Sequence, residues 1–498
     1  MPQKETGTLA TWRPQPEDLQ RVFDEQNPWH RSGVVPTTLA RDVERPLARQ
    51  LWESLHRDDP HRFQLVLGPR RVGKTTALYQ TVRHLITAGV DPSRIWWLRL
   101  DHPLLLQENL GDLVRAVLSA SGASTEQPVF LMLDELVYTS QWDLWLKTFF
   151  DDHWPVRIAA TSSATAALRE RRLESGVGRW SEQHLTPYLF TEFLDLVGQG
   201  HRLDVADTLA DTIRALPAGQ RADADLAAWR RLFMLVGGFP ELLTSISRRP
   251  DDESSRLLES QQVLRNDAVE RAVYKDIPQS FGVDNPMMLE RLLYVLAAQI
   301  TGSLSPSNIC SELGLSQPTF DRYLSYLEQA FLVFTLPNYS GREANIQKRG
   351  RKLYFVDGAI RNAALQRGLA PLDNPVELGA LLENLVAATL RSLSLHAGVR
   401  LHHWRDGKHE IDLVFDHPDR PLAFEIGSSP DHSRAGAKAF MERHPRFVDR
   451  CYLVAPQVAV AHPDTTSSGV GTLPLDLLLL AVGEQADKAL AQSLRVSA

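Results

Sequence analysis

Apolar residues between positions 41 and 200 fall into short runs, each followed by glycine or polar residues. Residues 75–87 instead carry apolar positions at helical spacing, as do residues 142–150. Short apolar runs bounded by glycine are typical of buried strands. The pattern therefore predicts a parallel sheet whose ligand-binding edge lies at the carboxyl ends of its strands. The four predicted strands cover residues 63–67, 95–98, 129–133 and 156–160.

The pattern changes twice in the rest of the chain. Residues 201–280 show helical spacing and no strand-like run, and residues 287–336 predict a compact unit of three helices. Strand patterns then return and alternate with helices, which predicts a second α/β domain. The strands expected there cover residues 353–356, 401–404, 411–415, 422–426 and 451–454, and the helices cover 377–394 and 434–443.

Composition limits the class of protein. The chain has 498 residues, of which 43% are hydrophobic and 23% charged, so it resembles an ordinary globular protein with three or four domains. Its net charge of −7 gives no whole-molecule attraction for nucleic acid. Two cysteines, and no run of about 18 apolar residues, favour a cytoplasmic protein that does not cross a membrane.

Residues 68–75 read Gly-Pro-Arg-Arg-Val-Gly-Lys-Thr, which matches the phosphate-binding loop pattern between a predicted strand and a predicted helix. Backbone N–H groups of such a loop face phosphates, Lys74 would reach the β- and γ-phosphates, and Thr75 would ligate Mg²⁺. We therefore expect ATP and Mg²⁺ as cofactors. The expected nucleotide-binding residues are Gly68, Pro69, Arg70, Arg71, Val72, Gly73, Lys74, Thr75, Thr76 and Ser162.

Two acids end the third predicted strand, at the sheet edge that also carries the glycine loop. Asp134 is expected to hold Mg²⁺, and Glu135 to polarise the attacking water, with Lys74 and Glu135 counted as catalytic. The alternative for both acids is a solvated strand end. Ser162 lies in a polar triplet, residues 161–163, that ends the next strand, where it would either contact the γ-phosphate or cap a helix.

These residues resemble the prokaryotic AAA-type ATPases that carry a C-terminal domain of unknown function, DUF4143. The resemblance spans residues 45–455 and rests on the glycine loop, the two acids after strand 129–133 and several later motifs. Those motifs are residues 178–179, 187–193, 237–241, 274–277, 322–324 and 353–357. It implies a P-loop ATPase core, a helical lid, a winged-helix-like unit and a restriction-endonuclease-like α/β domain. The expected boundaries are an N-terminal arm (1–40), the core (41–200), the lid (201–286), the winged-helix-like unit (287–345), the last domain (346–480) and a C-terminal tail (481–498).

An arginine from a neighbouring subunit stabilises the transition state in many assembled ATPases. Arg179 follows the fourth strand and is our candidate for this catalytic role in a homo-oligomer, with Arg169, Arg171 and Arg172 behind it.

The three-helix unit resembles a helix-turn-helix with its turn at Gly314. DNA contact would involve Gln317, Thr319 and Arg322, whereas the alternative is a packing module. Residues 341–352 are strongly basic and would either grip phosphates or form a solvated loop.

Three carboxylates of the last domain follow the order of the PD-(D/E)xK nuclease core: Glu383, Asp412 and Glu425. In that family such acids bind a divalent metal, and a lysine two residues after the last acid assists the attacking water. Gly427 stands at that position here, and Lys408 and Lys438 are the nearest replacements. We therefore expect a degenerate domain, in which the acids still hold a metal but cleave no DNA.

The leading hypothesis is an ATP-hydrolysing protein that couples nucleotide state to domain motion, with DNA as a candidate partner. The alternative is a nucleotide-dependent protein-binding switch or scaffold with slow turnover. An ATP-regulated nuclease is the third.

Overall fold

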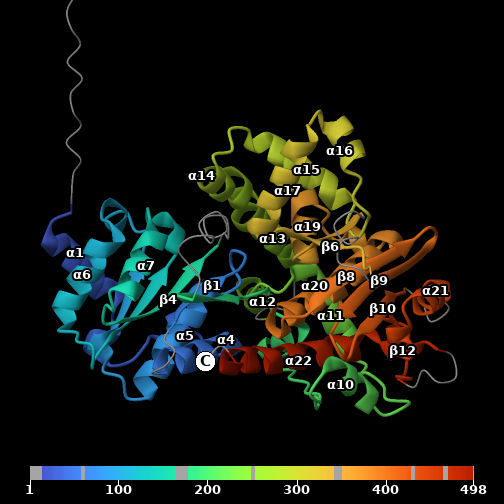
Figure 1. The fold of residues 1–498 in the computed structure, drawn as a ribbon, viewed down its shortest axis with the longest axis horizontal. Coiled ribbons are helices and arrows are strands. Elements are labelled where there is room, and N and C mark those ends of the chain that lie inside the picture. The colour runs from blue at the N-terminus through green and yellow to red at the C-terminus, as the bar shows by residue number, and fades with distance from the viewer. Residues whose placement is uncertain are drawn as a thin grey trace, which may run out of the picture. The chain divides into compact units, whose positions relative to one another are not determined.

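The structure is a computed structural model that describes residues 14–57, 62–163, 178–247, 253–340, 350–427, 432–463 and 469–496. The chain divides into two compact units. The first contains Met1–Val66 and Thr75–Ser162, and the second contains Leu67–Lys74 and His184–Ala498. Both units mix helices and strands, which confirms the predicted α/β class (Figure 1).

A five-stranded parallel sheet forms the centre of the first unit, in the order β2-β3-β4-β1-β5. Its strands are β1 (Phe63–Leu67), β2 (Ile95–Arg99), β3 (Val129–Asp134), β4 (Val156–Ser162) and β5 (Trp180–His184). The four strands predicted from apolar runs are present, whereas β5 was missed because its sequence, Trp-Ser-Glu-Gln-His, is mostly polar. The helices around this sheet are α4 (Pro46–His56), α5 (Lys74–Thr87), α6 (Leu110–Ser121) and α7 (Trp142–Asp151).

The expected loose N-terminal arm is wrong for residues 14–40, which form helices that cover the edge of this sheet. They are α1 (Pro16–Gln26), α2 (Trp29–Ser32) and α3 (Thr37–Ala40). The Asn27 amide donates to the Trp97 carbonyl at 3.1 Å and accepts from the Trp97 N–H at 2.6 Å, and the Trp29 indole donates to the Ile95 carbonyl. Asn27 thus pairs with the exposed backbone of edge strand β2, as a further strand would.

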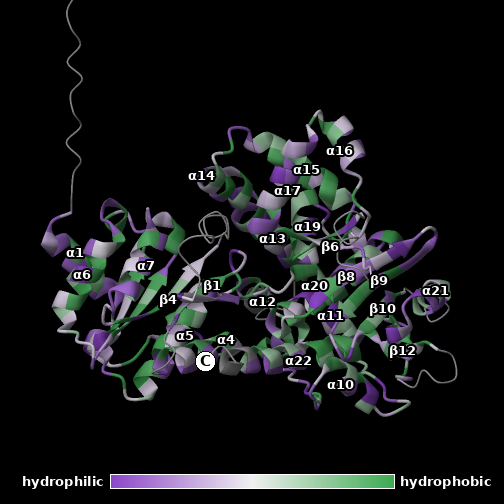
Figure 2. Ribbon diagram, in the orientation of Figure 1, coloured by the Kyte–Doolittle hydropathy of each residue, from purple (hydrophilic) through white to green (hydrophobic). Residues whose placement is uncertain are grey.

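Helices fill the second unit up to residue 329, and hydrophobic and hydrophilic stretches alternate along them (Figure 2). The helices are α9 (Phe190–Leu196), α10 (Leu209–Ala215), α11 (Leu226–Val236), α12 (Pro240–Ser247), α13 (Glu253–Leu264), α14 (Ile277–Phe281), α15 (Pro286–Ala298), α16 (Pro306–Leu313) and α17 (Gln317–Gln329). Two π-helical segments, η5 (Arg265–Glu270) and η6 (Ala272–Asp276), join α13 to α14. π-Helical turns are rare and often mark functional positions.

A two-stranded ribbon follows these helices, formed by β6 (Val333–Pro337) and β7 (Arg351–Phe355). The last sheet has five strands in the order β12-β11-β10-β9-β8. They are β8 (Arg400–Asp406), β9 (His409–Asp416), β10 (Leu422–Ile426), β11 (Cys451–Ala455) and β12 (Gly471–Pro474), and the helices of this region are α19 (Gly358–Leu365), α20 (Pro375–Ala397), α21 (Ala435–Arg443) and α22 (Leu475–Val496). Neighbours β8, β9 and β10 are antiparallel, whereas β10, β11 and β12 are parallel.

The expected tail at residues 481–498 is also wrong, because α22 continues to Val496 and packs against α9, α10 and α20. Among the described residues one helix, α20, is long and apolar enough to cross a membrane by length and composition alone. More than half of its apolar window is buried, and the helix packs on β7, β8 and β9. These contacts account for its apolar composition.

Candidate nucleotide site and carboxylate cluster

The glycine loop has a backbone that only some residues tolerate. A Cβ atom at Gly68 would lie 2.1 Å from the Leu185 carbonyl oxygen, so this position requires glycine. Gly73 has a φ of +90°, which glycine adopts without steric cost. Arg71 has a φ of 63° although it carries a Cβ atom. A conformation of this kind is costly for such a residue and is kept where surrounding contacts hold it.

Lys74 is the first residue of α5, and its side chain turns back into the loop. Its Nζ atom donates to the carbonyl oxygens of Gly68 at 2.9 Å and Pro69 at 2.8 Å. The residue is only 6% exposed, so its charge is held inside the loop. The site thus places an ammonium and a helix N-terminus together, both of which favour phosphate.

The two loop arginines form ion pairs with acids of the lid helices. The Arg70 guanidinium binds Asp276 through two bonds, Nε to Oδ2 at 2.5 Å and Nη2 to Oδ1 at 2.6 Å. Arg71 pairs with Glu241 of α12 and, at 2.5 Å, with Asp267 of η5. Because the Arg70–Asp276 pair is largely buried, this contact fixes the loop more firmly than an exposed pair would.

Thr75 and the end of β3 meet at the sheet edge. The Thr75 hydroxyl lies 3.2 and 3.1 Å from the two carboxylate oxygens of Asp134, which is 4% exposed. The Thr161 hydroxyl donates to Asp134 Oδ1 at 2.6 Å and accepts from the Glu135 N–H at 2.9 Å. Glu135 has a left-handed backbone with a φ of 58°, so the chain turns sharply directly after Asp134.

A hydroxyl and a carboxylate at this separation fit Mg²⁺, which prefers hard oxygen ligands. Thr75 and Asp134 are therefore the residues of this chain that would hold the ion. The sequence singled out Ser162, whereas Thr161 makes the contacts with Asp134 and Glu135. Successive side chains of a strand face opposite sides of the sheet. Thr161 and Ser162 at the end of β4 therefore face different sides, and the sequence could have shown that the two residues are alternatives.

The candidate arginine, Arg179, forms a two-bond ion pair with Asp151 at the end of α7. This pair would have to open before Arg179 reached a neighbouring subunit. Arg169, Arg171 and Arg172 lie outside the described residues.

The predicted DNA-reading helix corresponds to α17. Gln317 and Arg322 are exposed on it, and the Thr319 N–H donates to the capping Ser316 hydroxyl. Most of the basic stretch at 341–352 lies outside the described residues. Within the part that is described, Lys352 has a buried side chain, so its assignment to a phosphate-gripping surface is wrong.

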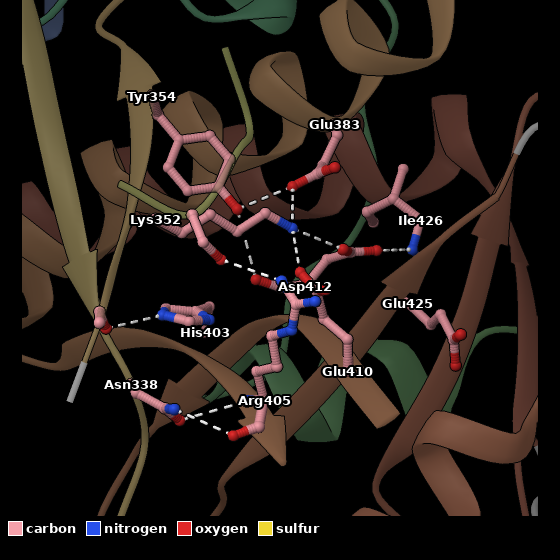
Figure 3. Close-up of polar contacts among 12 residues, drawn as sticks. Asn338, Lys352, Tyr354, Glu383, His403, Arg405, Glu410, Asp412, Glu425 and Ile426 are labelled. Atoms are coloured by element: carbon pink, nitrogen blue, oxygen red, sulfur yellow. Dashed lines mark hydrogen bonds and ion pairs between the residues drawn. The ribbon is translucent and has the colours of Figure 1, made fainter. Parts of the chain in front are cut away.

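Lys352 instead reaches a cluster of carboxylates in the last domain (Figure 3). Its Nζ atom lies 2.8 Å from Glu383 Oε1, 2.7 Å from Glu410 Oε1 and 2.9 Å from Asp412 Oδ1. The other carboxylate oxygen of Asp412 accepts from the Ile426 N–H at 2.9 Å, and the Tyr354 hydroxyl donates to Glu383 at 2.8 Å. An ammonium carried by β7 thus lies among these carboxylates.

The predicted metal set does not fit this arrangement. Glu425 lies beyond Asp412, and its carboxylate points away from Lys352 (Figure 3), with His432 Nε2 at 3.4 Å. Within the part of the chain that is described, no three His, Cys, Asp or Glu residues form a group that could hold a metal ion. The replacement lysines that we considered, Lys408 and Lys438, are both exposed. The carboxylates of Glu383, Asp412 and Glu425 therefore do not converge on one metal.

The pKa values of Glu383, Glu425 and Lys352 depart from their ordinary values. Burial, with the nearby Asp412 charge, raises the pKa of Glu383 to about 8 even though Lys352 lowers it. The same two causes raise the pKa of Glu425 to about 8. Burial alone would lower the pKa of Lys352, but its acidic neighbours together hold that pKa well above its usual value. Lys352 therefore stays protonated.

Comparison with known proteins places two recognised domains on this chain. Residues 60–194 match the family model of an AAA domain, and residues 378–467 match that of DUF4143. Two segments of the chain are thus similar to an AAA domain and to a DUF4143 domain. This confirms the resemblance inferred from the sequence. Residues 228–370 between them match a further domain of unknown function, DUF8612.

The chain is similar to two uncharacterized proteins of Methanocaldococcus jannaschii. Both are 24% identical, one over 78% of this chain and 79% of its own length, the other over 71% and 72%. An uncharacterized Haemophilus influenzae protein is 23% identical over 74% of this chain and 84% of its own length. The DNA clamp loader delta protein of Bacillus subtilis is 13% identical and covers 68% of this chain and 99% of its own. Its TM-score is 0.23, too low to support a shared overall fold.

Proposed function

We propose that this chain binds ATP together with Mg²⁺ and hydrolyses it to ADP and phosphate. One observation carries the proposal: the Thr75 hydroxyl and the Asp134 carboxylate lie within 3.2 Å of one another, directly after the phosphate-binding loop with its inward-facing Lys74. This is the residue set that P-loop ATPases use for the nucleotide and its metal. The AAA family match supports the same class of activity.

Each residue has a defined part in the reaction. Lys74 neutralises charge on the β- and γ-phosphates, while Thr75 and Asp134 would hold Mg²⁺, which would supply further positive charge when bound. Glu135 accepts a proton from water, whose oxygen bonds to the γ-phosphorus as the bond to the bridging oxygen of ADP breaks. Thr161 positions both acids, because its hydroxyl contacts Asp134 and the Glu135 N–H.

Two variants test this proposal. Lys74→Ala should weaken ATP binding by on the order of 100-fold, because it leaves phosphate charge unpaired. Glu135→Gln should keep ATP binding and lower kcat by about 100-fold or more, because the proton acceptor is lost. ATP affinity and phosphate release are measured for both, with exposed Lys408→Ala as the control. Unchanged turnover in both variants would exclude the ATPase.

We also propose that nucleotide binding acts on the lid. The support is that Arg70 and Arg71, both within the phosphate-binding loop, pair with acids on α12, η5 and η6. Phosphates placed against this loop compete with those acids for the same guanidinium groups. A change in the nucleotide therefore changes the contacts that hold the lid helices.

Deuterium exchange of residues 265–281 is the measurement for this coupling. ATP should change the exchange rate in the wild-type protein, and Asp276→Asn should reduce that effect because the two-bond pair with Arg70 is broken. Asp284→Asn is the matched control, since Asp284 follows the same helices and is exposed. An equal ATP effect in Asp276→Asn would contradict the coupling.

The second candidate is a nucleotide-dependent switch that turns over slowly and binds a protein. The same ion pairs favour this switch. In each nucleotide cycle the three lid acids would have to release Arg70 and Arg71. The ATPase rate measured with single-stranded DNA, with double-stranded DNA and without either separates the two candidates. Stimulation that is lost in Arg322→Ala, on the exposed face of α17, would favour a DNA-associated ATPase.

A further inference from the structure

The carboxylate cluster already contains a cation, and that cation belongs to a different element from the acids. Lys352 is on β7, whereas Glu383 is on α20 and Glu410 and Asp412 are on β9. The three Nζ–oxygen distances, 2.7 to 2.9 Å, are those of charge-assisted hydrogen bonds. An ammonium has three donors, and each reaches a different carboxylate here.

The backbone around Lys352 fixes where this ammonium lies. Lys352 pairs with Leu336 of β6 on one side and with Ser303, in the loop before α16, on the other. The neighbouring ribbon end is also joined to the last sheet, because the Asn338 amide donates to the Arg405 carbonyl and accepts from the Arg405 N–H (Figure 3). The lysine therefore enters the cluster from a strand held on both edges.

The carboxylate oxygens nearest to Lys352 already accept hydrogen bonds. Asp412 uses one oxygen for Lys352 and the other for the Ile426 N–H. Glu383 Oε1 accepts from both Lys352 and Tyr354. A divalent ion at 2.0–2.6 Å from the same oxygens would displace the ammonium, and an unpaired buried ammonium is strongly destabilising.

We propose that the Lys352 ammonium is the resident cation of this cluster, taking the place that a divalent metal holds in metal-dependent nucleases. The last domain then binds no divalent ion at Asp412. The same contact ties the β6–β7 ribbon, and with it the loop before α16, to the last sheet.

Mn²⁺ binding to the full chain tests the first part of this proposal. Free Mn²⁺ is measured by electron paramagnetic resonance for the wild-type protein and for Asp412→Asn, without nucleotide. The two should bind the same amount, since any ion held elsewhere is common to both. Mn²⁺ bound by the wild type and lost in Asp412→Asn would overturn the proposal.

Lys352→Met tests the second part, because it removes the charge and keeps a side chain of similar shape. Its melting temperature in EDTA should fall by about 5 °C or more, whereas exposed Lys408→Met should leave it unchanged. Adding Mn²⁺ should restore part of the melting temperature that Lys352→Met loses. If it does not, the proposal that the Lys352 ammonium takes the place of a divalent metal is overturned.

The double variant Lys352→Met/Asp412→Asn should melt above Lys352→Met, because one unpaired buried carboxylate is removed. If Lys352→Met does not fold, a folded double variant supports the proposal. A double variant no more stable than the single variant would overturn it. This test does not depend on the ATPase, which can fail or hold independently.

Discussion

At the scale of single residues, the Thr161 hydroxyl fixes two larger groups at once. It donates to the Asp134 carboxylate and accepts from the backbone N–H of Glu135, whose own backbone is left-handed. That acceptor opposes relaxation of the Glu135 turn toward a commoner conformation. Thr161 is therefore a positioning residue in the proposed ATPase.

Thr161→Val should lower kcat by about 10-fold with little change in ATP affinity, because the two hydrogen bonds that orient the acids are lost. Thr161→Ser keeps the hydroxyl and should retain most of the wild-type rate. Steady-state phosphate release over a range of ATP concentrations separates kcat from KM. Equal loss in both variants would contradict this role, because it would show that the hydroxyl alone does not preserve the rate.

Sequence analysis was able to predict those candidate site residues that are defined by their neighbours along the chain. Lys74, Thr75 and Asp134 could be placed because a loop motif and a strand end define their positions along the chain. Lys352 could not, because its partners lie 31 to 60 residues away and only tertiary pairing of β7 brings them together. The chain has only nine lysines, so the position of each one is informative. We interpreted Lys352 as a surface charge and missed its place in the cluster.

At the scale of elements, Asp357 joins a helix to a loop. Its carboxylate accepts from the Ala359 N–H at 2.8 Å, which caps α19, and from the Gly238 N–H at 2.7 Å, between α11 and α12. A Cβ atom at Gly237 would come within 2.7 Å of the same carboxylate. The two glycines of the motif at residues 237–241 therefore allow this close approach.

Burial raises the pKa of Asp357 to about 6, against the lowering effect of the two N–H donors. Between about pH 4 and pH 6 the folded state binds a proton that the unfolded state has lost, so this carboxyl stabilises the fold less as the pH rises. Urea unfolding of the wild type should show this loss of stability, and Asp357→Asn should lack it. The same slope in both proteins would assign the effect to other groups.

Elements with a strong apolar pattern could be predicted, and those without one could not. Strand β5 is polar, and β12 has only four residues. Helices α1 to α3 were missed because they cover an edge strand through Asn27 and Trp29 instead of forming one long amphipathic face. These contacts join residues far apart in the sequence, so they can be recognised only in the folded structure.

At the scale of the second unit, α22 holds distant helices together. Asp476 forms a buried ion pair with Arg230 of α11 at 2.5 Å, and Glu484 pairs with Arg202. Gly483 approaches α9 so closely that a Cβ atom would lie 2.4 Å from the Thr191 hydroxyl. The end of the chain is thus part of the core of this unit.

Arg230→Met should lower the free energy of unfolding by about 3 kcal/mol, because it leaves a buried carboxylate unpaired. Arg230→Met/Asp476→Leu removes both charges and should recover most of that loss. Urea unfolding of the full chain is the measurement, with exposed Arg322→Met as the control. A double variant as unstable as Arg230→Met would contradict a charge-pair explanation.

The position of α22 has a consequence for biosynthesis. A ribosome makes this helix after all the helices that it contacts, and residues 477–482 are buried against a core that includes α9 and α10, made more than 200 residues earlier. The first unit has its own sheet and can fold while translation continues. The second unit cannot complete its core before α22 has emerged, and until then the nascent polypeptide exposes the apolar surface of α20 against which α22 packs.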